Sequence, residues 1–468
     1  MKKVLLLAAA SAMVMAASAQ TVIAPPTVDA AKAAGYEGLW GDYQYGYVMP
    51  NGTTLVDDDN IKVVVDNGST DKPGANVALS SLNTTLFGSG FYMGSAASAG
   101  YFESVYSLQA LSNGIKQPYA IFNVNAKVGG ELTMYFNRGK NKATMYVWDI
   151  TVGDGVGTYV LASTVQTGVA DLVSEATVGL TAEHNYWIFV DGTGSNTLMY
   201  EMVYTPYTSE SYSAKGFDTS KFSTSVLPPT VDEAKEKGYE ALWGDYQYGY
   251  VIPNETALVD NDEIKVVVDN GSTDKPGANV ALSSLNTTAF NSGFYMGSAA
   301  SSGYFESVYS LQALSNGIKQ PYAIFTVDAK VGGELTMYFN RGKNKATLYV
   351  WDTTIGDGVG AYVLASTVQT GVADLVSKAV VGLTAEHKYW IFVDGTGSNT
   401  LMYGMGFNSY TSPNYGYTGE EGGDSSAITD IIVDQQSNSN VIYNVLGQKV
   451  DESYKGIVIK NGKKYIQR

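Results

Sequence analysis

The chain has 468 residues and a formal net charge of −16, from 29 Lys and Arg against 45 Asp and Glu. This acidic balance argues against a nucleic-acid partner, because proteins that bind phosphates need a surplus of cations. The sequence has no Cys and two His, which excludes disulfides and thiolate chemistry and leaves little room for His-based metal sites.

Residues 1–19 have the features of a secretory signal peptide. Lys2 and Lys3 precede the apolar stretch Val4–Ala16, and Ala17-Ser18-Ala19 forms an A-x-A cleavage site before Gln20. The apolar stretch is too short to span the ~30 Å hydrocarbon core of a bilayer. We therefore expect an exported protein, extracellular or on the outer-membrane surface, with no transmembrane segment in the mature chain.

A duplication dominates the remaining sequence. The segment 25–207 recurs without a gap at 228–410, an offset of 203 residues, and 26 of the 183 aligned positions differ. The two copies must therefore fold alike, and each is long enough for a core of its own. The connecting segment 208–227 is rich in Ser and Thr and is predicted to be a linker.

Short strands separated by turn residues are predicted within each copy. In chain order the first copy has a helix over 27–34, then strands over 61–65, 120–124, 131–136, 143–148, 159–163, 186–190 and 198–204. The alternating segments 131–136 and 143–148, joined by a loop that contains Gly139, predict a β-hairpin. This spacing predicts an all-β protein with two tandem β-sandwich domains.

The order of these elements resembles a known kind of domain. An aliphatic strand leads to Gly129-Gly130, two alternating strands, the segment Leu180-Thr181-Ala182 and a Gly/Ser/Asn turn before the last strand. This order is similar to that of the carbohydrate-binding-module-like jelly-roll domains that accompany pectate lyases in gut and oral Gram-negative anaerobes. The resemblance covers about 61–204 and its counterpart, and it implies a polysaccharide or glycan as the partner.

The C-terminal segment 428–468 carries a second resemblance, after a predicted Gly- and Glu-rich linker over 411–427. Tyr443-Asn444, Gly447-Gln448 and the run Lys455–Lys464 (KGIVIKNGKK) are similar to the sorting domain of the type nine (Por) secretion system. The resemblance implies contact with the secretion machinery, then release or surface attachment. The alternative is a plain capping hairpin. In either case, hairpins rich in Val and Ile predict a small β module.

Three aromatic residues of the predicted hairpin are the first candidate site. By period-two alternation, Tyr135, Tyr146 and Trp148 lie opposite the apolar Leu/Met face of the two strands. Sugar rings pack against flat exposed aromatic rings, so this face predicts glycan binding. The alternative is that another segment covers it as a second core layer. The counterparts in the second copy are Tyr338, Tyr349 and Trp351.

A second aromatic candidate lies near the start of each copy. In a strand, alternate Tyr residues project to one side as a ladder that can stack on sugars. The alternative, which we favour at this stage, is a set of cross-strand pairs that stabilise a sheet. The candidate residues are Trp40, Tyr43 and Tyr45, and in the second copy Trp243, Tyr246 and Tyr248.

Side-chain oxygens around a Gly turn form a third candidate. Carboxylate and amide oxygens are the ligands that Ca²⁺ prefers. The spacing is not that of an EF-hand, and turns are rich in these residues for other reasons. The sequence therefore requires no cofactor, and calcium is kept as a hypothesis for Asp66, Asn67 and Asp71, and for Asp269, Asn270 and Asp274.

Catalysis has little support in the sequence. His184 lies at the mouth of a predicted strand, and the chain has no nucleophile motif such as G-x-S-x-G. Two near-identical modules suit binding, because linking two weak sites raises avidity. The sequence predicts a secreted or surface-exposed, non-catalytic protein with two carbohydrate-binding-like modules. A structural or adhesive protein that binds proteins or itself is the alternative, and a polysaccharide-active enzyme is a third reading.

Overall fold

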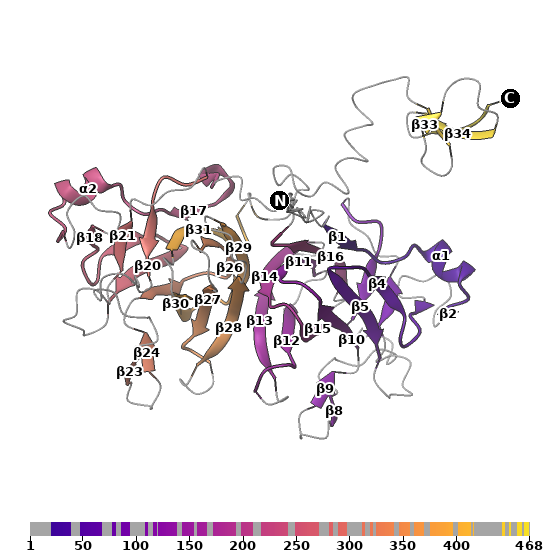
Figure 1. Ribbon diagram of the computed structural model, residues 1–468, viewed down its shortest axis with the longest axis horizontal. Helices are drawn as coiled ribbons and strands as arrows, with labels where there is room; N and C mark the ends of the chain where they lie inside the picture. The colour runs from indigo at the N-terminus through magenta and orange to yellow at the C-terminus, as the bar shows by residue number, and fades with distance from the viewer. Residues whose placement is uncertain are drawn as a thin grey trace, which may run out of the picture. The chain divides into compact units, whose positions relative to one another are not determined.

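The structure is a computed structural model in which the chain forms two compact units, Met1–Gly416 and Tyr417–Arg468 (Figure 1). It describes residues 20–38, 47–67, 77–80, 86–93, 108–110, 116–118, 120–137, 143–153, 157–165, 172–192, 198–208, 217–241, 249–270, 280–283, 289–296, 311–313, 319–321, 324–340, 346–355, 360–368, 375–395, 401–412, 415, 442–444, 449–450, 456–460 and 463–467.

Repeat 1 (residues 25–207) is a two-sheet β-sandwich, as the all-β prediction requires. The first sheet contains β1 (Thr21–Ile23), β2 (Glu37–Gly38), β3 (Tyr47–Val48), β6 (Ala78–Ser80), β7 (Gly90–Tyr92), β11 (Gly130–Phe136), β14 (Ser174–Leu180) and β16 (Leu198–Pro206). The second contains β4 (Thr54–Asp57), β5 (Ile61–Asp66), β10 (Ile121–Ala126), β12 (Ala143–Asp149), β13 (Thr158–Val165) and β15 (His184–Gly192). A separate pair comprises β8 (Leu108–Ala110) and β9 (Lys116–Pro118).

Repeat 2 (residues 228–410) repeats this arrangement. Its part of the first sheet contains β17 (Thr224–Val226), β18 (Tyr250–Val251), β21 (Ala281–Ser283), β22 (Gly293–Tyr295), β26 (Gly333–Phe339), β29 (Ser377–Leu383) and β31 (Leu401–Ser409). Its part of the second contains β19 (Ala257–Asp260), β20 (Ile264–Asp269), β25 (Ile324–Ala329), β27 (Ala346–Asp352), β28 (Ala361–Val368) and β30 (His387–Gly395). The separate pair is β23 (Leu311–Ala313) with β24 (Lys319–Pro321).

The predicted helix near the start of each copy is present. It is α1 (Val28–Ala33) in repeat 1 and α2 (Val231–Glu236) in repeat 2. Thr27 caps α1 by accepting the N–H of Ala30. Repeat 2 improves the cap, because Glu233 replaces Ala30 and accepts the N–H of Thr230 at 2.7 Å, which completes a capping box.

Alternating side chains build one core between the sheets. In β5, Ile61, Val63 and Val65 are fully buried while the residues between them are half-buried. Leu132 and Met134 of β11 face this layer from the opposite sheet, with zero exposure. One large apolar cluster contains buried residues of both repeats, and smaller clusters lie beside it.

The predicted hairpin of 131–136 with 143–148 is wrong. β11 pairs with β14 and β16 in the first sheet, whereas β12 pairs with β13 and β15 in the second. Each strand has one apolar face. The apolar faces of β11 and β12 are buried because the two strands lie on opposite sides of the core rather than side by side.

Both sheets run through the two repeats. β13 pairs antiparallel with β28 at Leu161 and Leu364, and β14 pairs with β29 at Thr177 and Val380. Figure 1 shows β13 and β28 next to each other between the repeats. The junction is tight, since a Cβ atom at Gly179 would lie 2.3 Å from the carbonyl oxygen of Thr367.

The second half of the predicted linker 208–227 is folded onto repeat 2. It contains the short helix η3 (Thr219–Lys221) and β17, which pairs with β31 of repeat 2. Gly406 makes room for this segment, because a Cβ atom there would lie 2.4 Å from the Phe222 ring. This packing thus depends on two aromatic side chains, Phe217 and Phe222, which stack at 5.1 Å.

The C-terminal unit contains a four-stranded antiparallel sheet. Its order is β33 (Lys449–Val450), β32 (Ile442–Asn444), β34 (Gly456–Lys460) and β35 (Lys463–Gln467). These strands coincide with the segments that carry the sorting-domain resemblance. Within the described ranges, no helix is long and apolar enough to cross a membrane.

Candidate ligand-binding surface

A row of aromatic side chains crosses the outer face of the second sheet in repeat 1. Trp148 of β12 lies directly opposite Tyr159 of β13 on one side and Trp187 of β15 on the other. Neighbouring strands lie about 4.8 Å apart, so the row runs perpendicular to the strands over roughly 10 Å. We call Tyr159, Trp148 and Trp187 the aromatic row of repeat 1.

The rings of the row are packed against one another and against the next layer. The Trp148 and Tyr159 rings meet edge to face, with centroids 4.4 Å apart and planes at 89°. Tyr146 stacks on Phe189 at 5.0 Å and contacts Tyr159 at 5.2 Å. Aromatic pairs in these geometries are favourable beyond the area that they bury. The row is therefore a rigid surface that needs little reordering to bind.

Tyr159 is the accessible end of the row. Its side chain is 37 % exposed, whereas Trp187 is 7 % exposed and Trp148 is half-buried. Burial, together with the nearby Tyr146 hydroxyl, raises the pKa of Tyr159 to about 12. The Tyr159 hydroxyl therefore keeps its proton at physiological pH and can donate a hydrogen bond.

Gly157 fixes the edge of Trp148. Its φ of +80° is in the left-handed region, and a Cβ atom there would lie 2.1 Å from the indole nitrogen of Trp148. That nitrogen is buried and has no hydrogen-bond partner among the described residues. Gly360 does the same for Trp351 in repeat 2, with φ +81° and 2.1 Å.

Planar amides continue the row on the far side. Asn123 of β10 lies opposite Trp187, and its amide donates to the Asp66 carboxylate at 2.6 Å. Asn125 donates to Asn185 at 2.8 Å on the next outward-facing positions. Flat aromatic rings bordered by amides provide both the apolar and the hydrogen-bonding contacts that a carbohydrate requires.

Repeat 2 carries the same row, made of Tyr362, Trp351 and Trp390. The Trp351 and Tyr362 rings meet at 4.5 Å and 88°, and Tyr362 is 38 % exposed. Because β28 and β13 are neighbours, both accessible tyrosines lie on the central strands of one sheet face. From the strand rise and spacing, their Cα atoms are on the order of 15 Å apart.

The structure brings only part of the first predicted site together. Tyr146 and Trp148 face outward from the apolar layer, as predicted, and so do Tyr349 and Trp351. Tyr135 lies on the other sheet, 7 % exposed, with its ring 5.7 Å from Phe87. Tyr338 likewise contacts Phe217 and Phe290, at 5.6 and 5.5 Å. The aromatic rows therefore exclude Tyr135 and Tyr338, because β11 and β12 belong to different sheets.

Tyr159, Trp187 and Phe189 were not predicted from the sequence as members of the surface. Each lies in a predicted strand, and alternation alone places Trp187 and Phe189 on one face of theirs. The cross-strand register brings them to Trp148, and a local sequence pattern does not specify that register. The other aromatic candidates, Trp40, Tyr43, Tyr45, Trp243, Tyr246 and Tyr248, lie outside the described residues.

The calcium candidates are described in part, since Asp71 and Asp274 lie outside the described residues. Asn67 is 4 % exposed and uses its side chain to close a loop: its oxygen accepts the N–H of Val77, and its amide donates to the carbonyl of Met49, both at 2.8 Å. Asn270 makes the equivalent bonds in repeat 2. In the described part of the chain, no cluster of three or more acidic or His side chains could hold a metal ion. Calcium stays a prediction.

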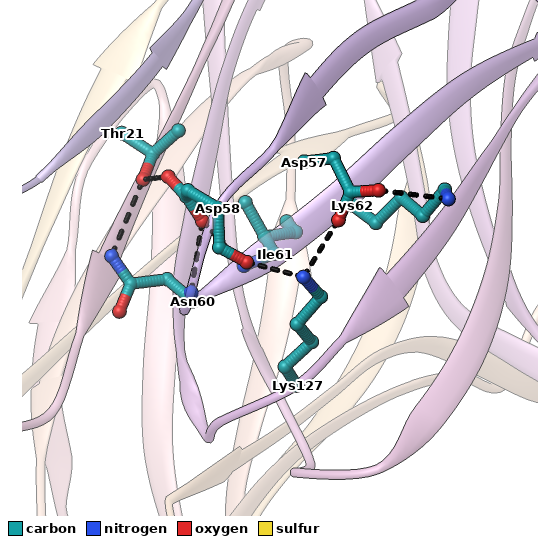
Figure 2. Close-up of polar contacts among 7 residues, drawn as sticks. All are labelled: Thr21, Asp57, Asp58, Asn60, Ile61, Lys62 and Lys127. Atoms are coloured by element: carbon teal, nitrogen blue, oxygen red, sulfur yellow. Dashed lines mark hydrogen bonds and ion pairs between the residues drawn. The ribbon is translucent and has the colours of Figure 1, made fainter.

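The neighbouring acidic run is held by cations and backbone donors (Figure 2). Asp57 accepts from Lys127 at 2.7 Å and from Lys62 at 2.8 Å, and these bonds lower the pKa of Asp57 to about 2. Asp58 accepts the Thr21 hydroxyl at 2.5 Å and the N–H groups of Asn60 and Ile61. The run therefore anchors β1 and β10 to the turn before β5.

His184 is paired with a carboxylate where β12 ends and β15 begins, in the second sheet. Its Nδ1 lies 2.7 Å from Asp149, whose other oxygen accepts the N–H of Thr151 at 2.9 Å. His387 and Asp352 repeat the contact at 2.7 Å. Among the described residues, no hydroxyl nucleophile hydrogen-bonds to either imidazole, and the pair joins the end of β12 to the start of β15.

No protein-family model and no curated protein matches the chain. Solved structures that resemble it include tandem modules of three kinds. The CBM22-1–CBM22-2 tandem domain of Paenibacillus barcinonensis Xyn10C has a TM-score of 0.20 and 8 % identity, over 77 % of this chain and 98 % of that one. The tandem CBM51 modules of Sp3GH98 from Streptococcus pneumoniae SP3-BS71 have a TM-score of 0.19 and 8 % identity, over 64 % of this chain and 87 % of that one. The CBM32-1 and CBM32-2 domains of Clostridium perfringens ZmpB have a TM-score of 0.20 and 10 % identity, over 79 % of this chain and 100 % of that one. At these TM-scores the similarity supports no inference about ligand or mechanism.

Proposed function

We propose that the chain is a secreted or surface-exposed, non-catalytic protein that binds polysaccharide on the outer face of its second sheet. The observation that carries this proposal is the pair of aromatic rows, each rigid, bordered by polar side chains and open at Tyr159 or Tyr362. Rigid aromatic side chains bind flat apolar surfaces at low entropic cost, and sugar rings present such surfaces.

The arrangement of the rows favours a polymer over a single sugar. Each row offers one accessible ring, so a single row provides weak binding. Two weak sites at a fixed separation make the second contact intramolecular, which raises avidity without new interactions. We therefore propose an extended polysaccharide as the ligand, contacted at both rows.

The test is affinity electrophoresis of the full chain in gels that contain a panel of soluble polysaccharides. Tyr159→Ala and Tyr362→Ala are each expected to weaken the retardation constant about three- to tenfold, since one aromatic contact is worth about 0.5–1.5 kcal/mol. The double variant is expected to abolish retardation. Leu227→Ala is the matched control, because Leu227 is an exposed apolar side chain (47 %) outside the rows.

Two outcomes would reject the polysaccharide proposal. If no polysaccharide retards the wild-type chain, the surface serves a protein partner or is structural, which was the alternative from sequence. If retardation occurs but survives the double variant, the glycan site lies elsewhere. Release of reducing sugar from a polysaccharide that binds would show that the protein is an enzyme.

For export we propose that residues 1–19 direct secretion and that the C-terminal unit is read by the secretion machinery. The sequence features of 1–19 and the small β-sheet within 428–468 support this proposal. N-terminal sequencing of the exported protein is expected to begin near Gln20. Deletion of 428–468 is expected to leave the protein inside the outer membrane; unchanged export of the truncated chain would contradict the sorting role.

A further inference from the structure

The junction between the repeats is two-fold symmetric. Gly179 donates to the Ser366 hydroxyl and Gly382 to the Ser163 hydroxyl, both at 2.7 Å. These partners differ by the duplication offset of 203, so exchanging the repeats maps the junction onto itself. The same holds for the Tyr207 hydroxyl on Thr367 and the Tyr410 hydroxyl on Thr164, at 2.9 and 2.6 Å. A fully symmetric junction would let repeat 1 pair equally well with another repeat 1.

Two of the positions that differ between the copies lie at the centre of this symmetry and face their own counterparts. Position 175 is Glu in repeat 1 and its counterpart is Lys378, and the two side chains form an ion pair of 2.8 Å. Thr177 lies directly opposite its counterpart, Val380, and its hydroxyl donates to Glu175 at 2.9 Å. The residues that make the symmetric hydrogen bonds are identical in both copies.

The ion pair is removed from water. The Glu175 and Lys378 side chains are 8 % and 17 % exposed. A pair of two repeats 1 would place Glu against Glu at this point, and a pair of two repeats 2 would place Lys against Lys. Like charges brought together with little solvent repel each other strongly, whereas the opposite charges attract.

Polar groups of both repeats surround the ion pair. Glu334 of repeat 2 accepts the backbone N–H of Glu175 at 3.2 Å and the Tyr415 hydroxyl at 3.1 Å. Burial, with the Glu175 charge nearby, raises the pKa of Glu334 to about 8, so this carboxyl is protonated at neutral pH and leaves Glu175 as the anion that faces Lys378. Tyr415 lies beyond the duplicated segment and also contacts Ser174 at 2.8 Å. It therefore joins repeat 2 to repeat 1 at this point.

We infer that Glu175 and Lys378 are pairing determinants: the junction accepts repeat 1 against repeat 2 and rejects two like repeats. The chain therefore closes on itself, and copies of the chain do not assemble through this surface. This inference concerns partner choice at the junction and does not depend on the proposed glycan binding.

The experiment uses the full chain with a protease recognition sequence in place of residues 209–216, cut after folding. Size-exclusion chromatography over a dilution series then measures whether the two fragments stay together. The variants are Glu175→Lys, Lys378→Glu and the double exchange, with Glu37→Lys as an exposed control that also reverses a glutamate. Circular dichroism of the uncut variants verifies that each one folds.

The expected result is one complex for the wild type and for the Glu37→Lys control. Each single reversal is expected to raise the dissociation constant at least about tenfold, and the double exchange is expected to recover most of the loss, because it restores opposite charges. Wild-type fragments that separate would overturn the inference. A double exchange as weak as the sum of the single reversals would also overturn it, since the charges would then not act on each other.

Discussion

Glu201 is a buried carboxylate that only one copy carries. It lies on β16, is 6 % exposed, and forms no hydrogen bond or ion pair with any described residue. Burial alone raises the pKa of Glu201 to about 7. Its counterpart is Gly404, so repeat 2 avoids this cost. At the residue scale the two copies are therefore unequal in how their stability depends on pH.

Replacing Glu201 by Gln is expected to stabilise the protein above pH 7 and to have little effect at pH 4. The raised pKa means that the folded state holds the proton more tightly than the unfolded chain, so the stability of the wild type falls as pH rises from about 4.5 to about 7 and is then constant. The variant should gain about 2–3 kcal/mol at pH 8 in urea unfolding.

The control for this comparison is Glu37→Gln, which changes an exposed glutamate. An equal effect of Glu201→Gln at pH 4 and pH 8 would contradict the buried-carboxylate interpretation, because a change in packing does not titrate.

At the element scale, β16 and β31 are equivalent strands of the two repeats whose sequences differ where another segment packs on them. Repeat 2 has Gly404 and Gly406 where repeat 1 has Glu201 and Val203. The two glycines lie under the segment that leads into β17, with Phe222 directly above Gly406. β1 pairs with β16 at the equivalent positions without these glycines, so the small residues make room for the Phe222 ring rather than for the strand pairing.

Gly406→Val is expected to destabilise the chain by about 2 kcal/mol, because a Cβ atom would lie 2.4 Å from the Phe222 ring and the segment that leads into β17 would have to move. Chemical denaturation measures the loss. The double variant Gly406→Val/Phe222→Ala should lose less stability than the sum of the losses of the two single variants, since the clash is gone. Strict additivity would argue against the contact.

Strand pairing marks the limit of prediction from this sequence. The duplication showed that the two copies must fold alike, and alternation identified the outward faces of Tyr146 and Trp148 correctly. Alternation also suggested a hairpin, because it describes one strand at a time and does not specify which strand lies beside it. Tyr135 was therefore grouped with Trp148, although β11 and β12 lie in different sheets, and Tyr159 was left out.

At the scale of the whole molecule, the repeats share one core rather than standing as beads on a linker. Both sheets and the apolar cluster are continuous across the junction. Gly179 and Gly382 permit this, because both backbones approach the opposite repeat too closely for any side chain. We expect repeats 1 and 2 to unfold as one cooperative unit.

Gly179→Leu is expected to separate the repeats. Its side chain would meet the Thr367 carbonyl and the Tyr207 hydroxyl, each 2.3 Å from the new Cβ atom. Calorimetry of the wild type should show one transition for the two repeats, and the variant should show two. Gly88→Leu is the control, since nothing lies within 4 Å of a Cβ atom at Gly88. Two transitions in the wild type would contradict the shared core.

The two-fold symmetry of the junction also fixes how the two aromatic rows are oriented relative to a bound polymer. Rotation by half a turn carries one aromatic row onto the other and reverses its orientation. A polysaccharide has a reducing and a non-reducing end, so one straight polymer would meet the first row head-first and the second tail-first. One polymer that contacts both rows would therefore present opposite ends to them, and its two contacts would be chemically different.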